Sequence, residues 1–260
     1  MELVVLGSGT SIPHPERGTS GYALRADDGT WLLLECGPGS TRRWPSAGIG
    51  LADVGAIAIT HHHVDHCCDL AAVLFGRNVV EPPVETPIVL AGPIGHARFV
   101  AGLEATYGSG VGDPHGVRTL VELDDGEHLV HGPFRLEART VAHVEGALGF
   151  RVECDGATFA FSGDSGPSSR LIDLCRGVDL ALVECSHPAY RESSSHLSTR
   201  TAAITARDAG VGHLVLTHFY PACDSVDVRG EVRAAGYEGP LTLAYDGLRV
   251  LVARRPGVSR

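Results

Sequence analysis

The sequence contains no lysine, although it has 21 basic residues, all arginine, together with 31 acidic residues and 14 histidines. Its formal net charge is therefore −10 at pH 7 with histidine neutral. A protein that binds many nucleic-acid phosphates normally presents a basic face to them. The composition argues against an extended nucleic acid as partner, and a GC-rich genome explains the use of arginine alone better than phosphate binding does.

Long apolar runs are also missing. No stretch approaches the roughly 18 to 20 consecutive apolar residues that span a bilayer, so we expect no membrane partner. The first residues, Met1 to Gly7, have no basic segment before their apolar stretch, which favours a first strand over a signal peptide. We therefore expect a cytoplasmic protein.

Paired cysteine patterns are absent too. The seven cysteines are an odd number scattered over 260 residues, which is not typical of a disulfide framework, and no Cys-x-x-Cys pair suggests a structural zinc site. With 20% charged and 43% hydrophobic residues, the composition excludes a disordered or coiled-coil protein. Since no linker or repeat is visible, we expect a single domain over residues 1–260.

Short aliphatic and β-branched runs, bounded by Gly, Pro, Asp or Asn, alternate with helical patterns along the chain. The predicted strands include 2–6, 22–26, 31–35, 56–60, 87–91, 134–141, 149–153, 158–162, 180–184, 213–217, 241–244 and 249–253. The predicted helices cover roughly 69–77, 95–106, 168–175, 198–209 and 226–235. This pattern predicts an α/β fold of the four-layer αββα type, with two mixed sheets face to face and helices outside.

Residues able to bind metal follow several of these strands. The segment 60–66 reads Thr-His-His-His-Val-Asp-His, so a tight loop offers His61 and His63 to one ion and Asp65 and His66 to a second. Imidazole and carboxylate together suit Zn²⁺, with Mn²⁺ or Fe as alternatives. The competing interpretation is a polar surface loop. We prefer the metal site, because four potential ligands follow a buried strand in this order.

Three further residues complete a ligand set. His143 follows the strand 134–141, Asp164 lies in Ser-Gly-Asp-Ser-Gly, and His218 lies in Leu-Thr-His-Phe-Tyr-Pro. Each of them alone is more often an ordinary loop residue. Together with the first motif they supply three ligands for each of two divalent ions and one shared ligand. Because strand ends gather at one edge of a sandwich, a rigid-walled site is expected there.

This set resembles that of the metallo-β-lactamase superfamily, and the resemblance covers nearly the whole chain. It implies one ion on His61, His63 and His143, a second on Asp65, His66 and His218, and a bridge through Asp164. The acidic Asp164, where the β-lactamases carry cysteine, argues against a true β-lactamase.

Two features are similar to the ribonuclease Z branch and its small phosphodiesterase relatives. One is the opening Leu-Gly-Ser-Gly-Thr-Ser-Ile-Pro followed by Arg-Gly-Thr-Ser-Gly, although Glu-Cys-Gly at 35–37 replaces the usual Asp-Cys-Gly. The other is a pair of motifs, 183–187 and 196–198, which implies that Glu184 holds His196 for protonation of the leaving oxygen. His187 competes for the acid role, and a surface Glu184 with His196 merely preceding a helix cap is the alternative.

The resemblance also bears on the substrate. Ribonuclease Z carries a long tRNA-binding arm between the third-motif His and the fourth-motif Asp, but only 20 residues separate His143 from Asp164. Two strands use most of them, so we expect an arm-less enzyme and a small phosphodiester such as a cyclic nucleotide. The alternatives are a ribonuclease Z-type tRNA 3′-processing endoribonuclease, a carbon-ester, thioester or lactone hydrolase, and a non-catalytic receptor.

The resemblance implies a reaction of known type. Two cations sharing Asp164 would lower the pKa of a bridging water towards about 7, so that hydroxide attacks the phosphorus. Asp65 could accept a hydrogen bond from this nucleophile, and His196 would protonate the leaving alkoxide. Relatives of this branch are commonly homodimers, which we carry over as an expectation.

Overall fold

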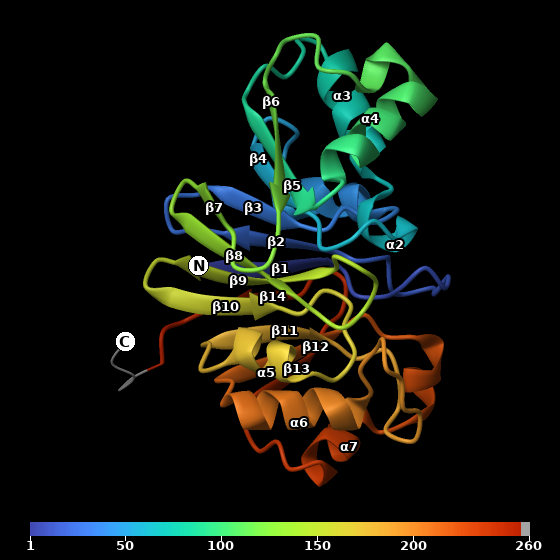
Figure 1. Cartoon of the computed structure of the whole chain (residues 1–260), viewed down its shortest axis with the longest axis vertical. Helices are drawn as coiled ribbons and strands as arrows, with labels where there is room; N and C mark the ends of the chain where they lie inside the picture. The colour runs from blue at the N-terminus through green and yellow to red at the C-terminus, as the bar shows by residue number, and fades with distance from the viewer. Residues whose placement is uncertain (256–260) are drawn as a thin grey trace.

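The computed structural model describes residues 1–255, whose strands form two seven-stranded mixed sheets packed face to face with helices outside them (Figure 1). The first sheet has the order β14 (Arg249–Leu251), β1 (Glu2–Gly7), β2 (Gly21–Arg25), β3 (Trp31–Leu34), β4 (Val54–Ala58), β5 (Ile88–Pro93), β6 (Arg118–Leu123). The second has the order β13 (Leu241–Leu243), β12 (His213–Thr217), β11 (Leu180–Glu184), β10 (Ala157–Phe161), β9 (Leu148–Cys154), β8 (Phe134–Thr140), β7 (His128–His131). The predicted four-layer α/β sandwich is confirmed.

Each sheet is half antiparallel and half parallel. In the first sheet β14, β1, β2 and β3 are antiparallel neighbours, and the pairs from β3 to β6 are parallel. In the second, β7 to β10 are antiparallel and β10 to β13 are parallel. Parallel neighbours end at the same edge of a sheet, so the loops after β3 and β4 lie together, as do those after β10, β11 and β12.

The helices cover the outer faces. In Figure 1, α3 (Leu70–Val79) and α4 (His96–Tyr107) lie at the top beside β4 to β6, whereas α5 (Ser169–Cys175), α6 (Thr199–Ala209) and α7 (Val228–Ala234) lie at the bottom beneath the second sheet. The short helical elements are α1 (Trp44–Ala47), α2 (Val64–Cys67) and the 3₁₀ turns Ser40–Arg43, Ser109–Val111 and Pro221–Ser225. Ser198 caps α6 in a reciprocal capping box with Thr201, as its sequence position predicts.

A continuous apolar core lies between the sheets. It contains Tyr22 from the first sheet and Phe161 from the second, whose ring centroids are 5.0 Å apart. The phenol of Tyr22 also lies 3.0 Å from the hydroxyl of Thr217, so its polar atom is satisfied inside the core. Two further apolar clusters lie outside the sheets, one under the helices of each outer layer. Strands β4, β10 and β12, which lead to candidate ligands, are buried on both faces, whereas β8 has one face largely toward solvent.

Some elements differ from the sequence prediction. Strands β6 and β7 were not predicted, and both are edge strands whose residues are largely exposed. The segment after His63 is not simply a tight loop, because Asp65 and His66 lie in the short helix α2. Within residues 1–255 no helix combines the length and apolar character needed to cross a membrane. All seven cysteines are free, in agreement with their odd number and scattered positions, which are not typical of a disulfide framework.

Candidate metal centre

The predicted ligands meet at one edge of the sandwich, and they come from both sheets. His61 and His63 follow β4 and lead into α2, which carries Asp65 and His66. The loops after β8, β10 and β12 carry the remaining three residues, His143, Asp164 and His218. The structure therefore brings together all seven residues that the sequence singles out as metal ligands.

One cluster is formed by His61, His63, His143 and Asp164, whose ligand atoms all lie within 4.8 Å of one another. Nδ1 of His63 lies 3.3 Å from Nε2 of His143. Oδ2 of Asp164 is 3.8 Å from Nε2 of His143 and 4.0 Å from Nε2 of His61. In a tetrahedral site with metal–nitrogen bonds of about 2.0–2.1 Å, ligand atoms stand roughly 3.3–3.4 Å apart, so this spacing suits a common ion.

A second cluster lies beside the first and consists of Asp65, His66 and His218. Oδ2 of Asp65 is 3.6 Å from Nε2 of His218 and 3.8 Å from Nε2 of His66. Asp164 reaches this cluster too, with Oδ1 3.3 Å from His218 Nε2 and Oδ2 3.4 Å from His66 Nε2. Asp164 therefore stands between the two clusters and lies within reach of both.

The polar atoms at the centre fit divalent metal ions. In the described part of the chain, no hydrogen-bond partner satisfies the buried Nε2 atoms of His61, His66 and His218 or Oδ1 of Asp164. Buried polar atoms normally have a partner, because leaving one unpaired costs about 1–3 kcal/mol. Four orphaned atoms that converge, all nitrogen or carboxylate oxygen, are accounted for by metal coordination.

A buried glutamate, Glu35, supports the first-sheet ligands. Its carboxylate accepts hydrogen bonds from the hydroxyl and the backbone N–H of Thr60. Thr60 Oγ1 lies 3.0 Å from Nδ1 of His61, and Glu35 Oε1 lies 3.3 Å from Nδ1 of His66. Glu35 therefore orients His66 directly and His61 through Thr60, which leaves both Nε2 atoms free for metal.

Glu184 plays the matching part in the second sheet. Its Oε1 lies 2.9 Å from Nδ1 of His196 and also accepts the N–H of Ser165 at 2.8 Å. Its Oε2 accepts a hydrogen bond from the hydroxyl of Ser186 at 2.6 Å. The hydroxyl oxygen of Ser186 in turn lies 3.0 Å from Nδ1 of His218. Glu184 thus holds His196 directly and the ligand His218 through Ser186.

Only part of this support could be predicted from the sequence. Glu184 was predicted, but Glu35, Thr60 and Ser186 were not predicted as supports, and Glu35 entered only as a departure from a motif. One signal was available in the sequence, because Glu35 is an acidic residue directly after the apolar run Trp31–Leu34, and the structure shows it to be buried. Its backbone is left-handed at φ 64°, as is that of His218 at φ 58°. Such a conformation costs a non-glycine residue of order 1–3 kcal/mol and is typical of functional sites.

The structure separates the two candidates for the general acid. His196 is 17% exposed at the rim of the site, and its Nδ1 lies 4.0 Å from Asp164 Oδ2. Burial lowers the pKa of His196, but the hydrogen bond and charge of Glu184 outweigh burial and raise it. His187 is buried, its Nδ1 has no hydrogen-bond partner among the described residues, and burial lowers its pKa. The arrangement favours His196.

Comparison with known proteins agrees with this geometry. The family description "Beta-lactamase superfamily domain" matches residues 30–219, which include all seven metal-facing side chains. A ribonuclease Z of Streptomyces coelicolor is 32% identical over 301 residues, covering 98% of this chain and 98% of that protein. The chain belongs to the metallo-β-lactamase superfamily.

Two other similar proteins extend the comparison. An uncharacterized protein of Mycobacterium leprae is 31% identical over 252 residues, covering 95% of this chain and 87% of its own. The metallo-β-lactamase fold protein YhfI from Bacillus subtilis superimposes with a TM-score of 0.82 at 22% identity, over 96% of this chain and 99% of that one, which shows the fold. Within the metallo-β-lactamase superfamily the chain lies in the ribonuclease Z-like branch, and the predicted class of metal-dependent phosphoric diester hydrolase is confirmed.

Glu35 offers a test of the support network. In a Glu35→Gln variant, one carboxylate oxygen becomes an NH₂ group that faces donors, so the hydrogen bonds from Thr60 and the ion-pair contact with His66 cannot all be kept. We expect metal affinity to fall about 10–100-fold, the usual effect of losing a residue that orients a ligand. Competition for zinc with a chromophoric chelator measures this, and unchanged affinity would remove Glu35 from the site.

Proposed function

We propose that the protein is a dinuclear-metal phosphodiesterase that hydrolyses a small phosphodiester such as a cyclic nucleotide. The observation that carries the proposal is His196, held by Glu184 at 2.9 Å and placed 4.0 Å from Asp164. A proton donor fixed beside a metal centre is needed when the leaving group is a poor one, as the alkoxide of a phosphodiester is.

Two ions are proposed in this site, with zinc as the first choice and manganese or iron as alternatives. His61, His63 and His143 would hold one ion, Asp65, His66 and His218 would hold the other, and Asp164 would contact both. When bound, such ions lower the pKa of a coordinated water and neutralise the charge that develops on a phosphoryl group.

The chain's own residues then have separate tasks. The Nδ1–H of His196 donates to Glu184, which fixes the tautomer and leaves Nε2 as the atom that gives a proton to the leaving oxygen. Asp65 is held in place by the backbone N–H of Ser11, which donates to Oδ2 at 3.0 Å. We propose that Asp65, besides binding metal, accepts a hydrogen bond from the nucleophile.

The choice of a small substrate rests on what lies between His143 and Asp164. Strands β9 and β10 occupy this interval and are joined by a two-residue turn, Asp155-Gly156, in which both residues have positive φ. Positive φ at both positions is typical of a tight hairpin turn, which leaves no room for an arm. The alignment with the Streptomyces relative runs over 301 positions, 41 more than the 260 residues of this chain, so that relative carries segments without a counterpart here.

Turnover of two substrates side by side tests the proposal. Metal-loaded protein is given a cyclic nucleotide and a precursor tRNA with a 3′ trailer, with Asp164→Ala protein as the blank. We expect cleavage of the cyclic nucleotide and little cleavage of the tRNA, because the chain lacks the arm and carries a net charge of −10. Efficient tRNA cleavage would instead favour tRNA 3′ processing, the function that the name of the Streptomyces relative suggests.

We further propose that residues 1–260 act as one domain in a homodimer, as the resemblance implies. Sedimentation of the metal-loaded protein would distinguish a dimer from a monomer.

A further inference from the structure

His63 is the metal-facing imidazole with the least support. Each of the other metal-facing imidazoles has its second nitrogen next to a polar atom: His61 at Thr60, His66 at Glu35, His143 at the Ser195 carbonyl and His218 at Ser186. His63 is exposed, and no hydrogen bond within residues 1–255 reaches its Nε2. Its position therefore has to be set through its backbone.

One side of that backbone is fixed by α2. The carbonyl oxygen of His63 accepts the N–H of His66 at 3.0 Å and the thiol of Cys67 at 3.1 Å. The other side is the peptide link to His62, the residue between the two ligands. Side chains alternate along an extended segment, so His62 points away from the metals when His61 and His63 point toward them.

His62 is held firmly on that far side. Its Nε2 lies 3.0 Å from Nδ1 of His96, and its ring stacks on Phe99 with centroids 4.4 Å apart and an interplanar angle of 15°. His96 itself is fully buried, and burial lowers its pKa to about 4, so it is neutral at pH 7 and can share one proton with His62.

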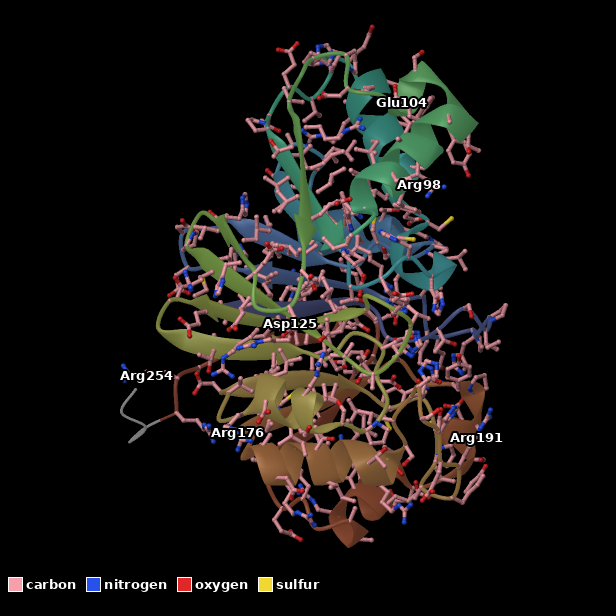
Figure 2. All side chains as sticks on the ribbon, in the orientation of Figure 1. Arg98, Glu104, Asp125, Arg176, Arg191 and Arg254 are labelled. Atoms are coloured by element: carbon pink, nitrogen blue, oxygen red, sulfur yellow. The ribbon has the colours of Figure 1, made fainter. Side chains whose placement is uncertain are left out.

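The first turn of α4 is in turn locked in place. A Cβ atom added to Gly92 would lie 2.4 Å from Nδ1 of His96, so β5 approaches the His96 ring more closely than any side chain allows. Glu122 of β6 accepts the backbone N–H groups of Gly95 and Ala97 at 3.0 and 2.9 Å. Arg98 and Glu104, both labelled on α4 in Figure 2, are exposed, whereas the buried residues of this helix, His96 and Val100, lie near its start.

We propose that His62 is a positioning residue: its hydrogen bond to His96 transfers the rigidity of α4 to His63 and so sets the affinity of the ion shared by His61, His63 and His143. The inference rests on the metal assignment proposed above. It predicts that metal affinity depends on the hydrogen bond between His62 and His96, and that a side chain of similar size without this hydrogen bond cannot replace His62.

Two variants of His62 separate these effects. His62→Phe keeps the stack on Phe99 and loses the hydrogen bond, whereas His62→Gln places an amide where Nε2 stands and restores it. We expect His62→Phe to weaken one of two bound zinc ions about tenfold, within the range known for residues that orient ligands. His62→Gln should bind both ions within about threefold of wild type. His213→Phe is the control: it loses a comparable hydrogen bond to Thr242 at the start of β12, the end of the strand away from His218, and its metal affinities should be unchanged.

Zinc titration against a chromophoric chelator measures both affinities, and thermal unfolding of the metal-free proteins provides the second readout. His62→Phe also leaves the buried Nδ1 of His96 without its partner, so the metal-free variant is expected to melt at a lower temperature than the wild type. The inference predicts that this loss of stability goes with weaker binding of one ion and unchanged binding of the other. If His62→Phe matches wild type in both affinities, or weakens both ions equally while lowering the metal-free melting temperature, the inference is wrong. If wild type binds no zinc, the metal assignment fails, and with it the proposed function.

Discussion

Replacing Asp164 by alanine is expected to remove bound metal and nearly all activity. The two carboxylate oxygens of Asp164 lie 3.3 Å from His218 Nε2 and 3.4 Å from His66 Nε2, and the same side chain reaches His143 and His61. Metal catalysis contributes several kcal/mol to transition-state stabilisation, and about 4 kcal/mol corresponds to roughly 10³-fold in rate.

Metal content by elemental analysis and kcat/KM on a phosphodiester check this expectation. Asp173→Ala is a suitable control, because Asp173 is an exposed residue paired with Arg176 on α5, so the same substitution is made away from the site. His218→Ala should behave like Asp164→Ala. Retention of two ions and of most activity in Asp164→Ala would show that the bridging position is misassigned.

Replacing His196 by alanine is expected to leave metal binding intact and to slow hydrolysis according to the leaving group. His196 is not among the metal ligands proposed above. Its Nδ1 is hydrogen-bonded to Glu184 at 2.9 Å. Loss of a general acid costs typically 10²–10⁴-fold when the leaving group is a poor one. An activated nitrophenyl ester needs no protonation, so its hydrolysis should change little.

The measurement compares kcat for bis(p-nitrophenyl) phosphate with kcat for a cyclic nucleotide in both proteins. His187→Ala serves as the matched variant, since His187 is the neighbouring histidine with its ring centroid 5.9 Å from that of His196. Equal losses on both substrates in His196→Ala would sink the acid role. A leaving-group-dependent loss in His187→Ala alone would transfer the role to that residue.

The metal-facing residues could be predicted because residues able to bind metal occur close together in the sequence or shortly after apolar strands. His61, His63, Asp65 and His66 form one short segment, His218 directly follows a short apolar strand, and Asp164 lies three residues after the end of another. Each of these residues alone is more often an ordinary loop residue, so the prediction of a common site rested on their combination. The orienting groups were not predictable in the same way. Glu35 and Thr60 come from neighbouring parallel strands, and their pairing depends on a register that the sequence does not state.

The elements missed by sequence analysis share a physical cause. β6 and β7 are edge strands with few buried residues, so they lack the apolar runs by which the other strands are recognised. The role of His62 was also missed, since its partners His96 and Phe99 lie in a helix more than 30 residues away. A polar pair formed across two elements leaves no periodic signal in either.

The division of the ligands between the sheets has a mechanical consequence. The sheets have separate hydrogen-bond ladders and are joined by side-chain packing and by a few backbone hydrogen bonds, such as that from the N–H of Leu148 to the carbonyl of Thr60 at 3.0 Å. Each proposed ion draws ligands from both, so a bound ion is a cross-link that ties the two halves of the sandwich at one edge. Binding energy is then also folding energy, worth about 2.7 kcal/mol when free metal stands at 100 times its Kd. The proposed catalytic centre would therefore also stabilise the packing of the two sheets against each other.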